Sequence, residues 1–152
     1  MNPRLNPEKA QPKAMKPMLA LEAYINGCGL EGPLIELVKT RASQINGCAY
    51  CIHMHTRDAR AAGESEERLY LLDAWRESPL YTPRERAALA WTESLTLVSE
   101  NHVPDAVWEE ARSQFDEAEM VDLTLLVTTI NAWNRIAIGF RAVHPSGTPG
   151  AA

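Results

Sequence analysis

Three side chains capable of redox or acid–base chemistry stand close together in the stretch INGCAYCIHMHTR, residues 45–57. Cys48 and Cys51 are three residues apart, and His55 follows the second cysteine by four. At about 100° per residue along a helix these three side chains fall on one face, whereas His53 falls on the opposite, solvent-facing side. Cα atoms at positions i and i+3 of a helix lie about 5 Å apart, within the range of a disulfide. The two cysteines can therefore be oxidised without unfolding a helix.

The start of this helix is also suited to a reactive thiol. Asn46 is a good N-cap residue, which would place Cys48 in the first turn, where unpaired amides and the positive end of the helix dipole favour a thiolate. His55, one turn after Cys51, can accept the thiol proton. Two alternatives stay open. The cysteines and the histidine can be ordinary core residues, or they can bind zinc with a carboxylate as the fourth ligand.

The composition favours one domain in a reducing compartment. The chain has 152 residues, 45% of them hydrophobic, and a net charge of −5, which argues against nucleic acid or an anionic membrane as the main partner. Prolines and basic residues occupy the first 18 positions in place of the apolar core of a signal peptide, and no apolar run is long enough to span a bilayer. We expect a cytoplasmic protein. Three cysteines cannot all pair within one chain, and a close pair in such a compartment is more often catalytic or metal-binding than structural.

The periodicity of the chain is typical of an all-α single domain. We expect a proline-rich arm at residues 1–17, a helical domain at 18–143 and a loose tail at 144–152. Two capping boxes mark helix starts, Thr82 with Glu85 and Asp116 with Glu119. The seven expected helices cover about 18–24, 33–45, 46–62, 65–75, 82–99, a short segment after 104, and 117–141.

The residues of the motif resemble a known family. Glu36 precedes Cys48 by twelve residues, and together with Cys51 and His55 it keeps the spacing of the signature of the alkylhydroperoxidase AhpD family. The segment ASQINGCAYC, residues 42–51, is close to the corresponding sequence of many members. The core of that family is shared by the carboxymuconolactone decarboxylases, but the decarboxylase branch lacks the cysteine pair. The resemblance therefore implies an AhpD-like fold of about six to seven helices, of the peroxidase branch.

The resemblance also implies an activity. AhpD-like proteins reduce organic hydroperoxides in antioxidant defence, without a metal or an organic cofactor, and they form trimers and hexamers. The family pattern assigns the peroxidatic role to Cys51 and the resolving role to Cys48, and a lipoyl-bearing protein restores the dithiol. The helix dipole alone would favour Cys48 as the stronger nucleophile. Two other functions remain as alternatives, namely a non-catalytic redox-responsive or zinc-holding oligomeric module and a carboxymuconolactone decarboxylase-like lyase.

Glu36 is the residue on which pattern and resemblance disagree. On a helical wheel it lies opposite the apolar face, with Lys39 and Ser43, which predicts a solvated side chain. The resemblance instead makes Glu36 the partner of His55 in a proton relay. That role requires another helix, or another subunit, to cover this face.

Four further positions complete the sequence-based interpretation. Tyr50 stands where some family members carry a second relay histidine, and a phenol with a reference pKa of about 10 is a poor proton acceptor near neutrality. His53 stands where relatives often carry aspartate, and we expect it at the surface. Cys28 has no partner within its own turn and is interpreted as structural. Trp133 and the polar residues that follow it interrupt the last apolar helix, which predicts a core, subunit or pocket contact.

Overall fold

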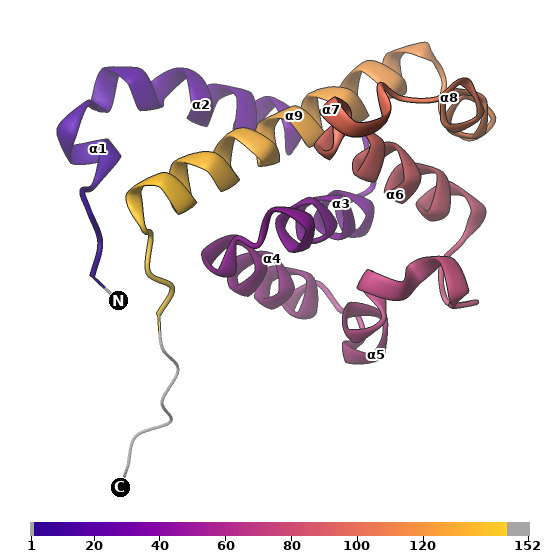
Figure 1. Cartoon of the computed structure of the whole chain (residues 1–152), viewed down its shortest axis with the longest axis horizontal. Helices are drawn as coiled ribbons and strands as arrows, with labels where there is room; N and C mark the ends of the chain where they lie inside the picture. Colours follow the sequence, from indigo (N-terminus) through magenta and orange to yellow (C-terminus); the bar gives the residue numbers. More distant parts are fainter. Residues whose placement is uncertain (1, 146–152) are drawn as a thin grey trace, which may run out of the picture.

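The computed structural model describes residues 2–145, and every regular element in that range is helical (Figure 1). The expected all-α class is confirmed. The helices are α1 (Pro7–Ala10), α2 (Pro12–Ile25), α3 (Gly32–Asn46), α4 (Ala49–Ala61), α5 (Glu66–Tyr70), the 3₁₀ helix η1 (Leu72–Glu77), α6 (Pro83–Thr96), α7 (Val98–Asn101), α8 (Asp105–Arg112) and α9 (Glu117–Phe140).

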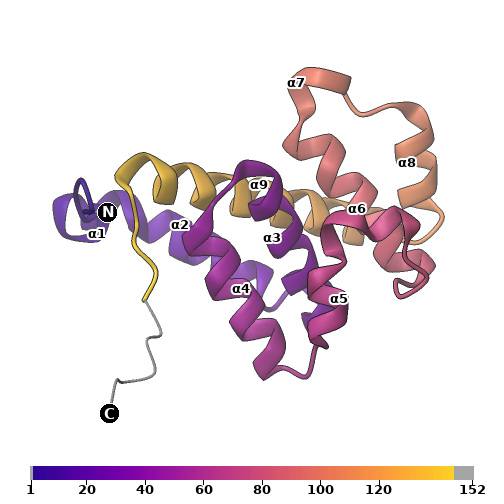
Figure 2. The same ribbon diagram turned by 60° about the horizontal axis from the view of Figure 1, so that its bottom comes forward.

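The long helix α9 is the support on which the other helices are arranged. It extends across the molecule with α2 along one side, while α3 packs against both α9 and α4 (Figures 1 and 2). At the other end α6 and α8 pack together, and α6 also contacts α3 and α9. The helix α3 therefore lies at the centre, with neighbours on most of its faces.

Two apolar clusters hold this arrangement together. The larger lies between α3, α6, α8 and α9 and contains fully buried residues such as Val38, Ala88, Leu123 and Leu126. The smaller joins α3 and α4 to α5, η1 and α6, with Leu72 and Trp75 among its members. Burial of one such aliphatic side chain stabilises the fold by about 1.5–3 kcal/mol. The two clusters together fix α3 and α4, the helices that carry the cysteine motif.

Both expected capping boxes are present. The Thr82 side chain accepts a hydrogen bond from the Glu85 amide at 3.2 Å, and the Glu85 carboxylate accepts one from the Thr82 amide. Asp116 and Glu119 make the same reciprocal pair at the start of α9, at 2.9 Å in both directions. These starts follow from local sequence, because the cap residues satisfy amides that lack helical partners.

The start of the chain differs from expectation. Helix α2 begins at Pro12, six residues before the expected start, and contains Pro17. Pro12 occupies the first helical position, where an amide hydrogen is not needed, and Met15 in the same turn is buried. Pro17 removes one backbone hydrogen bond, a loss that the helix tolerates. The arm expected at residues 1–17 is therefore partly helical.

Two further helix boundaries differ from expectation. The expected helix at 65–75 is divided into α5 and η1, and Ala74 has non-helical angles. The buried side chains Leu69, Leu72 and Trp75 are spaced by threes, the interval that a 3₁₀ helix aligns on one side. The expected helix at 82–99 ends at Thr96, and α7 follows.

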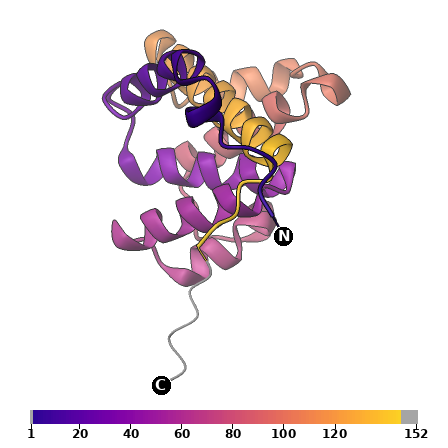
Figure 3. The same ribbon diagram turned by 90° about the vertical axis from the view of Figure 1, so that its left-hand side faces the viewer.

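The N-terminal arm is joined to the end of α9. The Arg4 amide donates to the Phe140 carbonyl at 2.9 Å, and the Arg4 guanidinium donates to the Gly139 carbonyl at 3.0 Å. Carbonyls of the last helical turn lack intrahelical partners, so the arm completes the helix end. Figure 3 shows the two chain segments side by side. Residues 146–152 of the expected tail lie outside the described range, and within that range no helix is both long enough and apolar enough to cross a membrane.

Candidate active site

The turn between α3 and α4 places the two cysteines. Gly47 adopts φ +68°, the left-handed conformation that ends α3, and Cys48 becomes the N-cap of α4. The expected N-cap, Asn46, is instead the last residue of α3. The side-chain Nδ2 of Asn46 donates to the side-chain oxygens of Asn131 and Asn134 at 3.0 and 2.8 Å. The Asn46 side chain, which the sequence predicted to cap a helix, therefore bonds to α9 instead.

Cys48 and Cys51 are joined as a disulfide, with Cα atoms 5.4 Å apart. The Cys48 sulfur also accepts the Cys51 amide at 3.4 Å, which is the capping interaction of α4. Both side chains are buried, but Cys51 lines a cavity and Cys48 is not among the described residues that line it. A molecule in this cavity would therefore lie next to Cys51 and not next to Cys48.

His55 and Glu36 face each other across α3 and α4. The Nδ1 atom of His55 lies 2.9 Å from Oε2 of Glu36, and both residues line the same cavity as Cys51. The solvated position that the helical wheel predicts for Glu36 is wrong, because its side chain is 20% exposed. Helices of the same chain cover this face, so no other subunit is needed to bring Glu36 to His55.

The neighbours of Glu36 on that face are more deeply buried. Ser43 donates to the Lys39 carbonyl at 2.7 Å and accepts from the Asn134 amide at 3.0 Å. Lys39 is 3% exposed and makes an ion pair with Glu22 of α2. The sequence-based interpretation missed Lys39 and Glu22 as site residues. The available signal was the position of Lys39, one turn after Glu36 on the same face.

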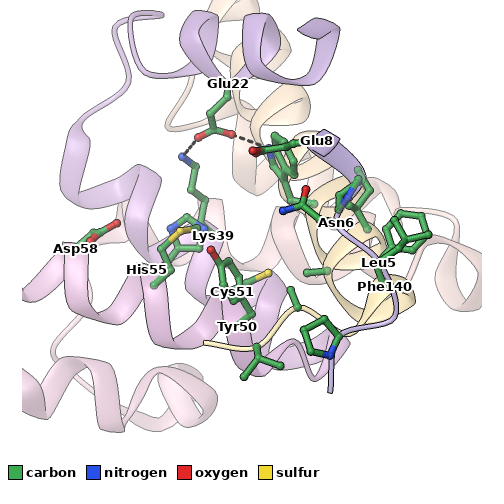
Figure 4. A pocket seen from close by; sticks show the side chains of 18 of the residues that line it. Leu5, Asn6, Glu8, Glu22, Lys39, Tyr50, Cys51, His55, Asp58 and Phe140 are labelled. Carbon is green, nitrogen blue, oxygen red and sulfur yellow. Dashed lines mark hydrogen bonds and ion pairs between the residues drawn. The ribbon is translucent and has the colours of Figure 1, made fainter. Parts of the chain in front are cut away.

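The cavity has a volume of about 690 Å³ and two kinds of wall (Figure 4). One side carries Cys51 with the polar residues Glu36, His55, Lys39 and Glu22. Its other side is largely apolar and is contributed by the N-terminal arm and the end of α9, with residues such as Leu5, Ile136, Phe140 and Val143. A ligand with one polar, reactive group and an apolar remainder fits such a division.

The remaining sequence-based candidates lie at different places. Tyr50 lines the cavity, whereas His53 is half-buried and stacks on the His144 ring, with centroids 4.8 Å apart. Cys28 packs against the larger apolar cluster, as its structural interpretation requires. Trp133 lines the cavity, and its indole donates to Glu22 at 3.1 Å. Among residues 2–145 no three His, Cys, Asp or Glu side chains are grouped so that they could hold a metal ion.

Comparison with known proteins identifies the family of this fold and motif. Residues 12–94, more than half of the chain, match the model of the carboxymuconolactone decarboxylase family. The chain belongs to this family. Its relatives within the carboxymuconolactone decarboxylase family include the uncharacterized protein YdfG of Bacillus subtilis, which is 44% identical over 138 residues, or 91% of this chain and 94% of YdfG.

Comparison with solved structures shows that this chain has an AhpD-like fold. A protein of unknown function from Agrobacterium tumefaciens, described as an AhpD candidate for antioxidant defence, is 46% identical and superimposes with a TM-score of 0.93 over 95% of this chain and 99% of its own. An uncharacterized peroxidase-related protein with an AhpD core, from Ralstonia eutropha, is 19% identical with a TM-score of 0.80, over 91% and 74% of the two chains. The second likeness concerns the fold alone. The resemblance to the AhpD family found in the sequence is confirmed.

Proposed function

We propose that this protein is a thiol-dependent hydroperoxide reductase, in which Cys48 and Cys51 alternate between a dithiol and a disulfide. The observation that carries the proposal is the position of Cys51. It lies one helical turn from a resolving cysteine, one turn from His55 and on the wall of a cavity with room for an organic molecule. Antioxidant defence is the role that follows from this chemistry.

The proposed reaction divides the work between the two sulfurs. His55, oriented by Glu36, accepts the Cys51 proton, and the thiolate attacks the terminal oxygen of the hydroperoxide. An S–O bond forms and the O–O bond breaks, which gives a sulfenic acid and an alcohol. The Cys48 thiol then displaces water from the sulfenic acid to form the disulfide. A dithiol restores the pair by exchange.

The cavity supports the assignment of the two roles. The attacking sulfur must meet the peroxide, and Cys51 lines the cavity. The resolving sulfur needs only to meet Cys51, which Cys48 does across one helical turn. This assignment agrees with the family pattern, and it opposes the order that the helix dipole alone favours.

Variants of single cysteines test the proposal. We expect Cys51→Ser to lose turnover of cumene hydroperoxide with a dithiol. Cys48→Ser should still consume one equivalent of peroxide and stop at a sulfenic acid that dimedone traps. Mass spectrometry of the wild type after mild peroxide treatment should show a loss of two hydrogens in the peptide that spans both cysteines. Cys28→Ser is the matched control, with turnover unchanged. Full turnover by Cys51→Ser would overturn the proposal.

The two alternative functions give different results in the same experiment. A decarboxylase-like lyase, which the name of the family favours, keeps its activity after both cysteines become serine. A zinc-holding module contains one tightly bound zinc per chain, and its thiols do not react with peroxide.

The partners belong to the same proposal. The reductant is a protein-bound dithiol, for which a lipoyl group is the family's choice, and free dihydrolipoamide should support turnover. We further propose that the protein is cytoplasmic. We also propose that it is a homo-oligomer, a trimer or a hexamer, and light scattering of the purified protein tests this oligomeric state. Tyr50, at the position of a possible relay residue, is proposed to donate a hydrogen bond in the cavity, and Tyr50→Phe should then slow peroxide reduction without abolishing it.

A further inference from the structure

The proposed reaction leaves one buried cation without a role. The Lys39 side chain is 3% exposed, lines the cavity and is held by Glu22. The second oxygen of Glu22 accepts the Trp133 indole at 3.1 Å. Both oxygens of the carboxylate are therefore occupied, and its orientation is fixed from two sides. Figure 4 shows Lys39 extending toward Glu22 from the part of the cavity that holds His55.

The helical hairpin places Lys39 at the level of Cys51. Helices α3 and α4 are antiparallel, since only Gly47 and Cys48 connect them. Glu36 meets His55, so an advance of three residues along α3 corresponds to a retreat of three along α4, to position 52, next to Cys51. The rise over three residues is about 4.5 Å. The backbone of Lys39 therefore lies at the level of Cys51, and its side chain extends from there along the cavity toward Glu22.

The ammonium group has donors to offer to the cavity that Lys39 and Cys51 both line. It carries three N–H groups, and Glu22 is the acceptor recorded for it among the described residues. The remaining donors are available to an oxygen atom in the cavity that Lys39 lines. A donor fixed in a water-poor site is more effective toward developing negative charge than one in solution.

We infer that Lys39 donates a hydrogen bond, and then a proton, to the oxygen that leaves when Cys51 attacks a hydroperoxide. This inference rests on the proposed function. As the S–O bond forms and the O–O bond breaks, the departing oxygen becomes an alkoxide, and the Lys39 ammonium supplies the proton that converts it to the alcohol. The amine regains a proton from solvent, and the proton that His55 took from Cys51 is released there. The sum is thiol plus hydroperoxide to sulfenic acid plus alcohol.

The leaving group provides the test. An alkoxide is a strong base and needs the proton, whereas the acetate that leaves from peracetic acid is a weak one. We expect Lys39→Met to slow oxidation of reduced Cys51 by tert-butyl hydroperoxide about 100-fold or more, the usual loss of one such donor. With peracetic acid the loss should stay below about fivefold, because little stabilisation is needed. Rapid quench and mass spectrometry of the full chain give both rate constants.

Alkylation of Cys51 by iodoacetamide is the control, since iodide leaves without a proton. An unchanged alkylation rate shows that Lys39→Met leaves the thiolate and the fold intact. Equal losses with both peroxides would overturn the inference, because Lys39 would then act on the thiol or on the structure. If the wild type oxidises with neither peroxide, the proposed function fails first.

A second variant covers the case in which the single change disturbs folding. Lys39→Met leaves Glu22 facing an apolar chain, and Lys39→Met/Glu22→Gln removes both charges together. The double variant should show the same selective loss with tert-butyl hydroperoxide. Glu22→Gln alone keeps the lysine but weakens its orientation, so it should give a smaller loss with the same selectivity. Absence of selectivity in the double variant would contradict the inference even if the single variant does not fold.

Discussion

Replacement of Glu36 by Gln tests whether the carboxylate acts through its charge on His55. The two side chains are 2.9 Å apart, and their exposed fractions are 20% for Glu36 and 7% for His55. A hydrogen bond to a charged group contributes about 1.5–3 kcal/mol, and every 1.36 kcal/mol is tenfold in rate, so the expected loss is about 10- to 150-fold. Glutamine keeps the length and an acceptor oxygen, so the change removes the negative charge beside His55 and little else.

The assay is the rate of Cys51 oxidation by cumene hydroperoxide, measured by rapid quench and mass spectrometry. Glu67→Gln is the matched control, because Glu67 is exposed on α5 and should leave the rate unchanged. A rate for Glu36→Gln within twofold of the wild type would refute the relay, since the pair would then be structural. An equal loss in both variants would show that the net charge of the protein, and not this contact, sets the rate.

Two predictions concern stability. Burial alone raises the pKa of Glu93, but hydrogen bonds from Trp75, Arg76 and Arg41 together outweigh it and lower that pKa. The stabilisation of the fold by the ionised Glu93 is therefore fully present above the pKa of about 4.3 that this carboxyl has in the unfolded chain. It is lost as pH falls through the lower pKa of the folded state. Glu93→Gln should cost about 1–3 kcal/mol in urea unfolding at pH 7, and the cost should shrink progressively as pH falls below about 4; a cost independent of pH would contradict this. Asp116→Ala removes the acceptor of the Glu119 amide and should lower Tm by roughly 3 °C, whereas an unchanged Tm in calorimetry would show that the cap is dispensable.

Local signals were sufficient for much of the fold. The two capping boxes depend on residues three apart and on the amides of one helical turn, so the sequence alone could predict them. The cysteine and histidine spacing likewise fixes which side chains share a face of α4. Helix geometry predicted the close approach of Cys48 and Cys51, and the 5.4 Å Cα separation agrees with it, although Cys48 is the N-cap of α4 and not one of its helical residues.

Tertiary contacts decided the features that local signals predicted wrongly. Glu36 and Lys39 lie on a face that looks solvated, because a helical wheel does not include the neighbouring helices that cover it. Asn46 is a good cap by type, but α3 continues through Asn46 and ends at Gly47, and the Asn46 side-chain amide bonds to residues of α9 instead. Pro17 lies inside a helix that the sequence predicted to begin only at residue 18, after a proline-rich arm. The proposed role of Lys39 also depends on Glu22 of α2, a contact that the pattern of α3 alone does not reveal.

The chemistry and the walls of the cavity come from separate parts of the chain. The cysteines, His55, Glu36 and Lys39 all belong to the hairpin of α3 and α4, whereas much of the apolar lining comes from residues 3–8 and 133–143. Substitutions in these two outer segments, apart from Trp133, which bonds to Glu22, can therefore alter the size or shape of an accepted molecule without touching the reacting groups. Because Arg4 ties one outer segment to the other, a change in either is transmitted to its neighbour, and the pair is the natural target for redesign of substrate preference.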